Sequence, residues 1–400
     1  MTATRTARFW AIAAGAGFWL AAAVLLWRTS VPADLDLPRV EASPFFDERE
    51  LERSGRYERG LRLIWLGAVV VELVLLGVAA WLAPRARVRG VLGGVTLGAG
   101  TLVAVWLGRL PFVLTAHWWR RRYGISRSDY ATILVDPWLE RLGALAAACA
   151  AIALVMVLAR RLGERWWLVG GPAFAALGAA FLLAQPLLLV PRLAPLRDDV
   201  VTAEIRTLAR RQGVGDIEVQ VRDASRRTGA INAELYGLGP TKRIILWDTA
   251  LDGRLSRAEI RSLAAHEFGH VEANHIWKSI AWLVLFAVPG AFVVARVTRR
   301  RGGLGRPAAV PLALLTVTVL GLAVLPATNA ISRRYEAEAD WLAIRATKDP
   351  RAFEGLTRRL AQASLTHPDP PRWAVLLLET HPSPLQRIAM SRAAALRGGS

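Results

Sequence analysis

The stretch SLAAHEFGHVEANH, residues 262–275, holds the side chains best suited to chemistry by type and spacing. His266 and His270 are four residues apart, so on a helix both imidazoles lie on one face, about 6 Å apart along the axis. Zinc takes imidazole ligands, and Glu267 between them can accept a proton from metal-bound water. The motif is short, and two helix-surface histidines beside a solvated glutamate are the alternative.

A third ligand is needed, because catalytic zinc uses three protein ligands and leaves one tetrahedral position open. Residues 329–346, NAISRRYEAEADWLAIRA, offer Glu336 and Asp340, again four residues apart on an expected helix. Glu336 can complete a His-His-Glu site, and Asp340 can orient a ligand imidazole from behind. Glu338, offset by two residues, points elsewhere. The alternative for Glu336 is an exposed glutamate paired with Arg333.

Membrane spans are among the elements that must position these residues, since 54% of the 400 residues are hydrophobic. Runs of roughly 20 apolar residues predict transmembrane helices. The first such run is too long for the core of a signal peptide, so a retained helix is expected. Seven spans are predicted: Phe9–Trp27, Leu63–Ala83, Gly90–Thr115, Leu142–Ala159, Trp166–Val190, Trp277–Ala295 and Ala309–Thr328.

Two kinds of hydrophilic segment alternate between these spans. Four are short and together hold 13 Arg and one acid: 1–8, 84–89, 160–165 and 296–306. Four are longer and mixed in charge: 28–62, 116–141, 191–276 and 329–400. Seven spans place all the mixed segments on one side of the membrane. The hairpin of the last two spans therefore brings His270 close to Glu336.

Segment 191–276 has the pattern of a folded soluble unit. Residues 216–223, 229–236 and 242–251 alternate or run apolar, as strands do. Ser256 followed by Glu259 forms a capping box, which is the usual start of a helix. Helix-forming residues follow, so HEFGH is expected on a helix.

Charge and cysteine content exclude other classes. The net charge of +19 would suggest nucleic-acid binding on a soluble basic face. Here the arginines mostly lie at the ends of apolar runs, where they mark membrane boundaries, so no nucleic-acid partner is expected. A single cysteine, Cys149, excludes a disulfide framework and a multi-thiolate metal site.

Together these motifs resemble the M48 family of metallopeptidases, and within it the integral-membrane CAAX prenyl proteases. The likeness also covers SRRTGAINAELYGLGPTKRIILWDTAL (225–251), HPSPLQRI (381–388) and AHWWRRRYGISRSD (116–129), and runs from about residue 60 onward. Val271 and Glu272 depart from it, because eukaryotic members tend to have Trp-Lys after HExxH. The implied fold class is mainly α integral membrane: seven transmembrane helices with a zincin-like α+β metallopeptidase domain split by the last two spans.

That fold divides the chain into four parts. Residues 1–190 carry five spans and the extramembrane loop 28–62, in which no chemistry is identified. Residues 191–276 form the first part of the catalytic domain, 277–328 the last two spans, and 329–400 the second part of the catalytic domain. Glu72 lies inside the second span, where a carboxylate is costly. It either lines a water-filled chamber, which the resemblance implies inside the helix barrel, or pairs with an arginine such as Arg109.

The resemblance also implies roles for single residues. One Zn²⁺ per chain would be held by His266, His270 and Glu336, with Glu267 as general base. Asn232 and Ala233 match an edge strand that holds an extended peptide substrate. His381 and Arg387 match residues that stabilise the tetrahedral intermediate or hold substrate; a capping turn and a surface arginine are the alternatives.

The predicted function is a membrane-embedded zinc metalloendopeptidase acting on peptide or protein substrates, of CAAX type or otherwise membrane-associated. The alternatives are a seven-span transporter or receptor with an incidental HExxH, and an inactive scaffold of the same fold. High Ala, Arg and Gly with few Lys indicate a GC-rich bacterial genome, hence the bacterial plasma membrane. Basic-residue density favours an active site outside the cell, whereas the resemblance favours the cytoplasm, which we adopt.

Overall fold

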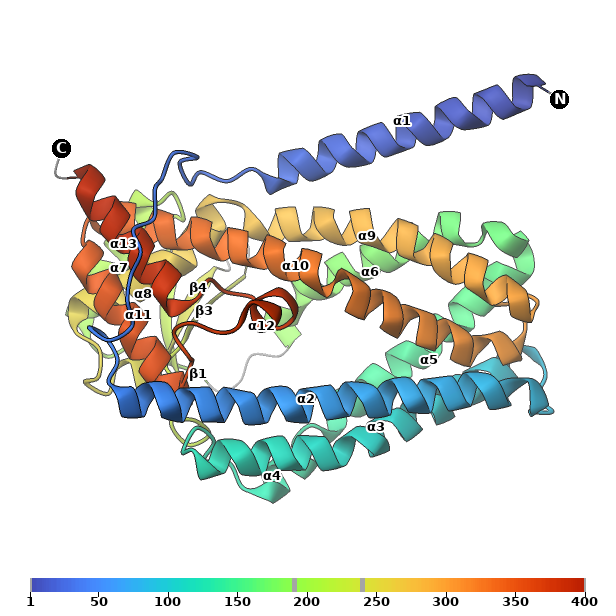
Figure 1. The fold of residues 1–400 in the computed structure, drawn as a ribbon, viewed down its shortest axis with the longest axis horizontal. Helices are drawn as coiled ribbons and strands as arrows, with labels where there is room; N and C mark the ends of the chain where they lie inside the picture. The colour runs from blue at the N-terminus through green and yellow to red at the C-terminus, as the bar shows by residue number, and fades with distance from the viewer. Residues whose placement is uncertain (1, 189–192, 238–241, 399–400) are drawn as a thin grey trace.

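The computed structural model describes residues 2–188, 193–237 and 242–398. Helices dominate the described chain (Figure 1). The first six are α1 (Thr2–Trp27), α2 (Glu48–Leu82), α3 (Gly90–Arg122), α4 (Tyr130–Val135), α5 (Trp138–Leu162) and α6 (Trp167–Leu188). The others are α7 (Asp199–Arg211), α8 (Arg257–Glu272), α9 (His275–Thr298), α10 (Val310–Thr347), α11 (Pro350–Ser364), α12 (Arg372–Leu377) and α13 (Pro384–Gly398).

Five helical stretches are long and apolar enough to cross a membrane: Glu48–Arg85, Gly90–Arg122, Tyr130–Arg165, His275–Arg301 and Pro307–Thr347. They contain the second, third, fourth, sixth and seventh predicted spans. The other two predicted spans are helical as well, but their apolar stretches among the described residues are shorter, Ala13–Trp27 and Trp167–Leu183. The end of the predicted Trp166–Val190 span, residues 189–190, lies outside the described residues.

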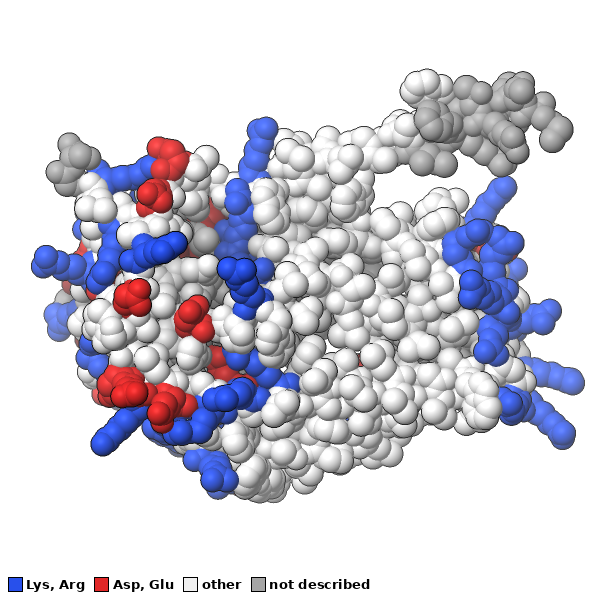
Figure 2. Space-filling view, viewed as in Figure 1, with Lys and Arg blue, Asp and Glu red and all other residues white. Residues whose placement is uncertain are grey.

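Charged side chains gather at the two ends of the face seen in Figure 2, with an uncharged band between them. One end shows almost only Lys and Arg, and it is where α2, α5 and α9 end. Arg160 lies in the last turn of α5, and Arg85 and Arg299 belong to the short 3₁₀ helices that follow α2 and α9. The other end carries both signs of charge and contains α8 and the last part of α10 (Figure 1). HEFGH and Glu336 therefore lie at the same, mixed-charge end.

The carboxylate inside α2 has the predicted partner. Arg109 Nη1 of α3 donates to Glu72 Oε2 at 2.8 Å. An ionised group at membrane depth is expensive unless it is paired, and α2 and α3 run side by side (Figure 1). This pair satisfies both charges, so Glu72 needs no catalytic role to explain its presence.

A small sheet lies at the mixed-charge end, with strands β1 (Leu193–Pro195), β2 (Glu218–Arg222), β3 (Ala233–Tyr236) and β4 (Arg243–Trp247) in the order β1-β2-β4-β3. β2 and β4 are parallel, and the two outer pairings are antiparallel. The three strands β2, β3 and β4 fall inside the segments predicted to be extended. β1 was not predicted. β3 forms one edge of the sheet.

One hydrophobic core joins the two parts of the chain that flank the α9–α10 hairpin. Ile244 of β4 and Phe268 of α8 come from the first part, and Phe353 and Leu356 of α11 from the second; all four are fully buried. Val31 and Leu35, from the segment before α2, pack against the same core. Residues 28–47 therefore line the soluble part of the protein, and residues 48–62 are the first turns of α2.

Candidate metal centre

Helix α8 begins and ends where its sequence dictates. The Ser256 side chain accepts from Glu259 N at 3.3 Å, and the Glu259 carboxylate accepts from Ser256 N at 2.7 Å, which is the predicted capping box. At the other end Asn274 takes a left-handed conformation with φ 57°, which asparagine tolerates better than most residues. Because of this turn, α9 starts at once and His275 folds back toward His270.

Helix α10 carries the acidic residues toward α8 without a break between its apolar part and its soluble part. Glu336 and Asp340 lie one turn apart on the side that packs against α8. The two helices approach closely at Gly269, where an added Cβ would be 3.0 Å from the Cα and the carbonyl oxygen of Ala339. Glycine inside HEFGH thus sets the distance across which Glu336 reaches the histidines.

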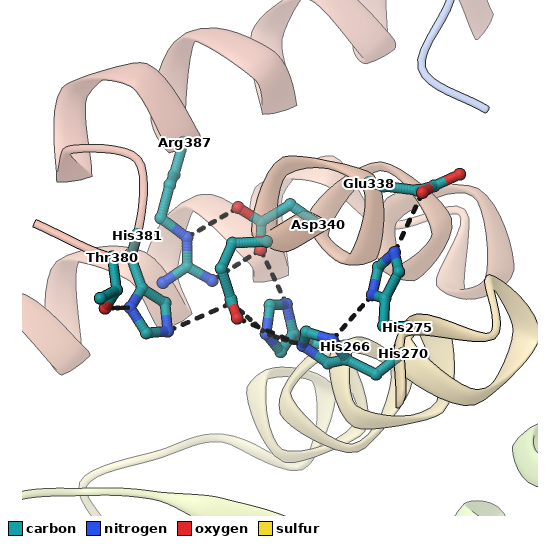
Figure 3. Close-up of polar contacts among 9 residues, drawn as sticks. His266, His270, His275, Glu338, Asp340, Thr380, His381 and Arg387 are labelled. Carbon is teal, nitrogen blue, oxygen red and sulfur yellow. Dashed lines mark hydrogen bonds and ion pairs between the residues drawn. The ribbon is translucent and has the colours of Figure 1, made fainter. Parts of the chain in front are cut away.

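His266, His270 and Glu336 meet as the sequence predicts. The Nε2 atoms of the two histidines, which are labelled in Figure 3, are 3.3 Å apart. Glu336 lies 3.2 Å from His266 Nε2 and 3.6 Å from His270 Nε2. Two ligand atoms on a tetrahedral ion with bonds of about 2.0–2.1 Å are separated by about 3.3 Å. Their ligand atoms all lie within 4.8 Å of one another, so the group could hold one metal ion.

The hydrogen bonding of Glu336 agrees with this fit. Its Oε2 atom is buried and has no hydrogen-bond partner, although nitrogens of His266 and His381 lie 3.2 and 3.1 Å away. Leaving a buried carboxylate oxygen unsatisfied costs more than a typical hydrogen bond contributes. A cation held by His266, His270 and Glu336 would satisfy that oxygen. The residues present therefore fit a metal ion.

Asp340 contacts His266 on the ring side opposite the cluster. His266 Nδ1 donates to Asp340 Oδ1 at 2.8 Å, which leaves Nε2 free to face the cluster. Arg387 completes this arrangement, because its Nε and Nη2 donate to the two oxygens of Asp340 at 2.8 and 2.7 Å. Sequence reasoning placed Arg387 near the substrate and missed its pairing with Asp340.

Electrostatics separate the roles of the two histidines. Burial lowers the pKa of His266, but the neighbouring carboxylates of Asp340 and Glu336 outweigh burial and raise it to about 10. Burial and the neighbouring charge of His266 lower the pKa of His270 to about 3. Without a metal ion, His266 is therefore the protonated member of the cluster, and a cation would have to displace that proton.

Glu267 and His381 flank the cluster. Burial raises the pKa of Glu267 to about 7, against the opposing effects of the His266 charge and the Leu235 N–H. His381 lies before α13 with its side chain 58% exposed, and its Nε2 is 3.1 Å from Glu336 Oε2. Its Nδ1 lies 3.0 Å from Thr380 Oγ1 (Figure 3). Both groups can thus act on a molecule that approaches the cluster.

The predicted substrate strand lies next to the HEFGH helix. Among the described strands β3 pairs with β4 alone, and Trp247 N donates to the Asn232 carbonyl at 3.1 Å. Backbone groups alternate in direction along an antiparallel strand, so the N–H and C=O of Ala233 face the free edge. Leu235, two residues on, directs its N–H to Glu267. A sheet edge without a described strand partner therefore borders the candidate base.

A cavity of about 420 Å³ reaches the cluster from the apolar side. His270 and Glu336 are at one end of its lining, and the remainder is largely apolar, including Trp282, Phe286 and Tyr335. A second cavity of about 620 Å³ lies beside α2 and α3, lined by apolar residues together with charged ones that include Arg62, Arg109, Arg120, Glu58 and Glu379. Of these two cavities, the first thus offers space directly beside His270 and Glu336.

Similar proteins are found by sequence and by structure. The chain is 31% identical over 244 residues to "Uncharacterized metalloprotease YhfN" of Bacillus subtilis, covering 58% of this chain and 57% of the relative. It is 27% identical over 239 residues to "CAAX prenyl protease 1 homolog" of Oryza sativa subsp. japonica, covering 55% and 56%. The matched stretch thus spans little more than half of these relatives.

The fold extends further than the sequence match. Ste24p of S. mikatae has a TM-score of 0.73 with 18% identity, over 94% of this chain and 96% of that chain. The whole described architecture, helices and small sheet together, is therefore shared with a known fold. The sequence model of Peptidase family M48 matches residues 195–395, which include every residue of the cluster, both flanking groups and the edge strand. The chain, an integral membrane protein with a His-His-Glu cluster fit for a metal, belongs to peptidase family M48.

Proposed function

We propose that the protein is a membrane-embedded zinc metalloendopeptidase with one Zn²⁺ per chain held by His266, His270 and Glu336. The observation that carries the proposal is the convergence of these three side chains beside the half-buried Glu267 and the edge strand β3. When bound, zinc would acidify a water ligand and polarise a substrate carbonyl.

Glu267 is the general base in this proposal. Its carboxylate takes a proton from the attacking water and passes it to the leaving amine. A base works best when its pKa lies near the working pH, and burial raises the pKa of Glu267 to about 7. The Leu235 N–H, which bonds to this carboxylate, keeps it at the end of the substrate strand.

The substrate lies extended along β3 in this proposal. Its backbone pairs with the outward-facing groups of Ala233, next to Asn232, as a strand added to the sheet edge. The exposed imidazole of His381 donates to the oxyanion that develops on the scissile carbonyl. Arg387 acts at one remove, by holding the Asp340 carboxylate that orients His266.

We also propose that the chain has seven spans, because α1 and α6 continue the apolar pattern of the five longer spans. The last two spans then split the catalytic domain. The substrates we propose are membrane-associated proteins, lipidated or not, because a largely apolar cavity of about 420 Å³ reaches His270 and Glu336. The site faces the cytoplasm of a bacterial plasma membrane in this proposal. A reporter fused after Ser400 tests that orientation.

Zinc content and cleavage test the proposal together. We expect one zinc per chain in detergent-solubilised wild type and in Glu267→Gln, and loss of zinc in Glu336→Ala. Wild type alone should cleave a peptide. Wild type without zinc would favour a transporter or receptor, and zinc without cleavage of any peptide would favour a scaffold. Equal rates on a farnesylated peptide and its unmodified counterpart would exclude recognition of the lipid.

A further inference from the structure

The second histidine of HEFGH has a buried partner that the proposed mechanism does not use. His270 Nδ1 lies 2.9 Å from His275 Nδ1, and His275 Nε2 lies 3.0 Å from Glu338 Oε2. His275 stands between His270 and Glu338 in Figure 3. His275 and Glu338 are only 4% and 3% exposed, so this chain of contacts is shielded from water.

One arrangement of protons satisfies all of these contacts. The Glu338 carboxylate can only accept, so a neutral His275 carries its proton on Nε2 and leaves Nδ1 as an acceptor. His270 then carries its proton on Nδ1 and donates it to His275. That tautomer leaves the lone pair of His270 Nε2 directed at His266 and Glu336. Glu338 thereby fixes which nitrogen of His270 faces the metal.

We infer that His275 and Glu338 are positioning residues for His270, a role that rests on the proposed metal site. Each of the two ligand histidines is then oriented by a carboxylate of α10. Asp340 contacts His266 directly, at 2.8 Å. Glu338 acts on His270 through the imidazole of His275, which lies between them. Partners of this kind hold a ligand ring in place and raise its basicity.

The relay, which we define as the contacts from His270 through His275 to Glu338, is held in place by its neighbours. The ring of His275 stacks on Tyr335, with centroids 4.5 Å apart and planes 10° apart. Glu338 Oε1 accepts from Ser30 N at 2.6 Å, and its Oε2 lies 3.2 Å from Lys278 Nζ. The segment that follows α1 therefore fixes the far end of the relay.

Two substitutions of His275 separate hydrogen bonding from packing. Asparagine and leucine have similar size and shape, and both lose the stacking on Tyr335. Only asparagine places an acceptor oxygen at the position of Nδ1. We expect His275→Leu to weaken zinc binding by about 10–100-fold in a chelator competition, and His275→Asn to stay within about threefold of wild type. Glu338→Gln, which can turn an amide N–H toward His275, should also weaken binding.

Cobalt provides a second readout that does not depend on catalysis. Cobalt-loaded His275→Leu should show shifted visible absorption bands, because the ligand ring is no longer fixed, whereas His275→Asn should keep the wild-type bands. The matched control is His117→Leu. His117 is equally buried, at 3%, but lies on α3 and contacts Ser126, so this change should leave zinc affinity unaltered.

Each outcome decides a separate question. Zinc affinity and cobalt bands unchanged in His275→Leu would overturn the positioning role and leave the proposed function standing. Equal losses in His275→Asn and His275→Leu would also overturn it, because packing alone would then explain the effect. A wild type that binds neither metal would overturn the metal site together with this inference. If His275→Leu does not fold, Glu338→Gln with wild-type affinity would be the contrary result.

Discussion

Gly269 of α8 lies so close to Ala339 of α10 that a Cβ on the glycine would be 3.0 Å from the Ala339 Cα. Backbone atoms cannot rotate away as a side chain can, so Gly269→Ala must push the two helices apart. We expect a loss of about 1–3 kcal/mol in the free energy of unfolding, together with weaker zinc binding. Thermal unfolding in detergent and chelator competition measure the two effects.

The control for Gly269→Ala is Gly290→Ala in α9, where an added Cβ meets nothing within 4 Å. Alanine is the better helix former by about 1 kcal/mol, so the control should be neutral or stabilised. If both variants behave alike, α8 and α10 can separate without consequence for the cluster.

The pH dependence of cleavage should report on Glu267. The base must be ionised to accept a proton, so kcat/KM should rise with pH as Glu267 loses its own proton. Burial raises the pKa of Glu267 to about 7, and the charge of a bound cation favours the carboxylate. The acidic limb should therefore lie at or below that value. A rate that falls between about pH 5 and 7 as pH rises would exclude this role.

Zinc uptake should release protons. The carboxylates of Asp340 and Glu336 overcome burial and raise the pKa of His266 to about 10, while burial and the His266 charge lower that of His270 to about 3. At neutral pH and without zinc, His266 is thus doubly protonated, and its extra proton must leave when zinc binds. Titration with zinc in weakly buffered dye solution should release about one proton per zinc, and more when the bound water also ionises. No release would mean that His266 is neutral before zinc binds.

Arg387 offers a test of two roles. If it holds Asp340, Arg387→Ala should leave a buried carboxylate without its main partner, cost about 3–5 kcal/mol of stability and weaken zinc binding. If it acts on the substrate, kcat should fall while zinc affinity stays constant. Arg392→Ala on the same helix is the control, because Arg392 pairs with Glu354 at the surface and should contribute under about 1 kcal/mol.

Local patterns predicted the parts of the site that depend on local structure. A capping box fixes the start of α8, and helical spacing alone puts His266 and His270 on one face. The same spacing aligned Glu336 with Asp340. Alternation of basic and mixed segments placed both helices at one end of the molecule. Each of these inferences needs only neighbours a few residues apart, or a count of spans.

The rest depends on contacts between distant segments. Arg387 is 47 residues from Asp340, and no spacing rule links a lone arginine to a carboxylate in another helix. His275 reaches His270 only because Asn274 turns the chain with φ 57°, which the sequence alone did not indicate. β1 is three residues long, too short to show alternation. Val31 and Leu35 pack against the core, but they lie in a segment rich in charged residues whose pattern does not predict burial.

Helix α10 runs as one element from the basic end to Thr347, with Pro326 inside it. A helix that spans a bilayer adjusts its tilt when the thickness of the hydrocarbon layer changes. Glu336 follows Pro326 on that same helix. A change in the tilt of α10 would therefore move Glu336 relative to the histidines of α8. The acyl-chain length of the surrounding lipid would then influence the geometry of the site, and the membrane would act as an effector of the His-His-Glu cluster.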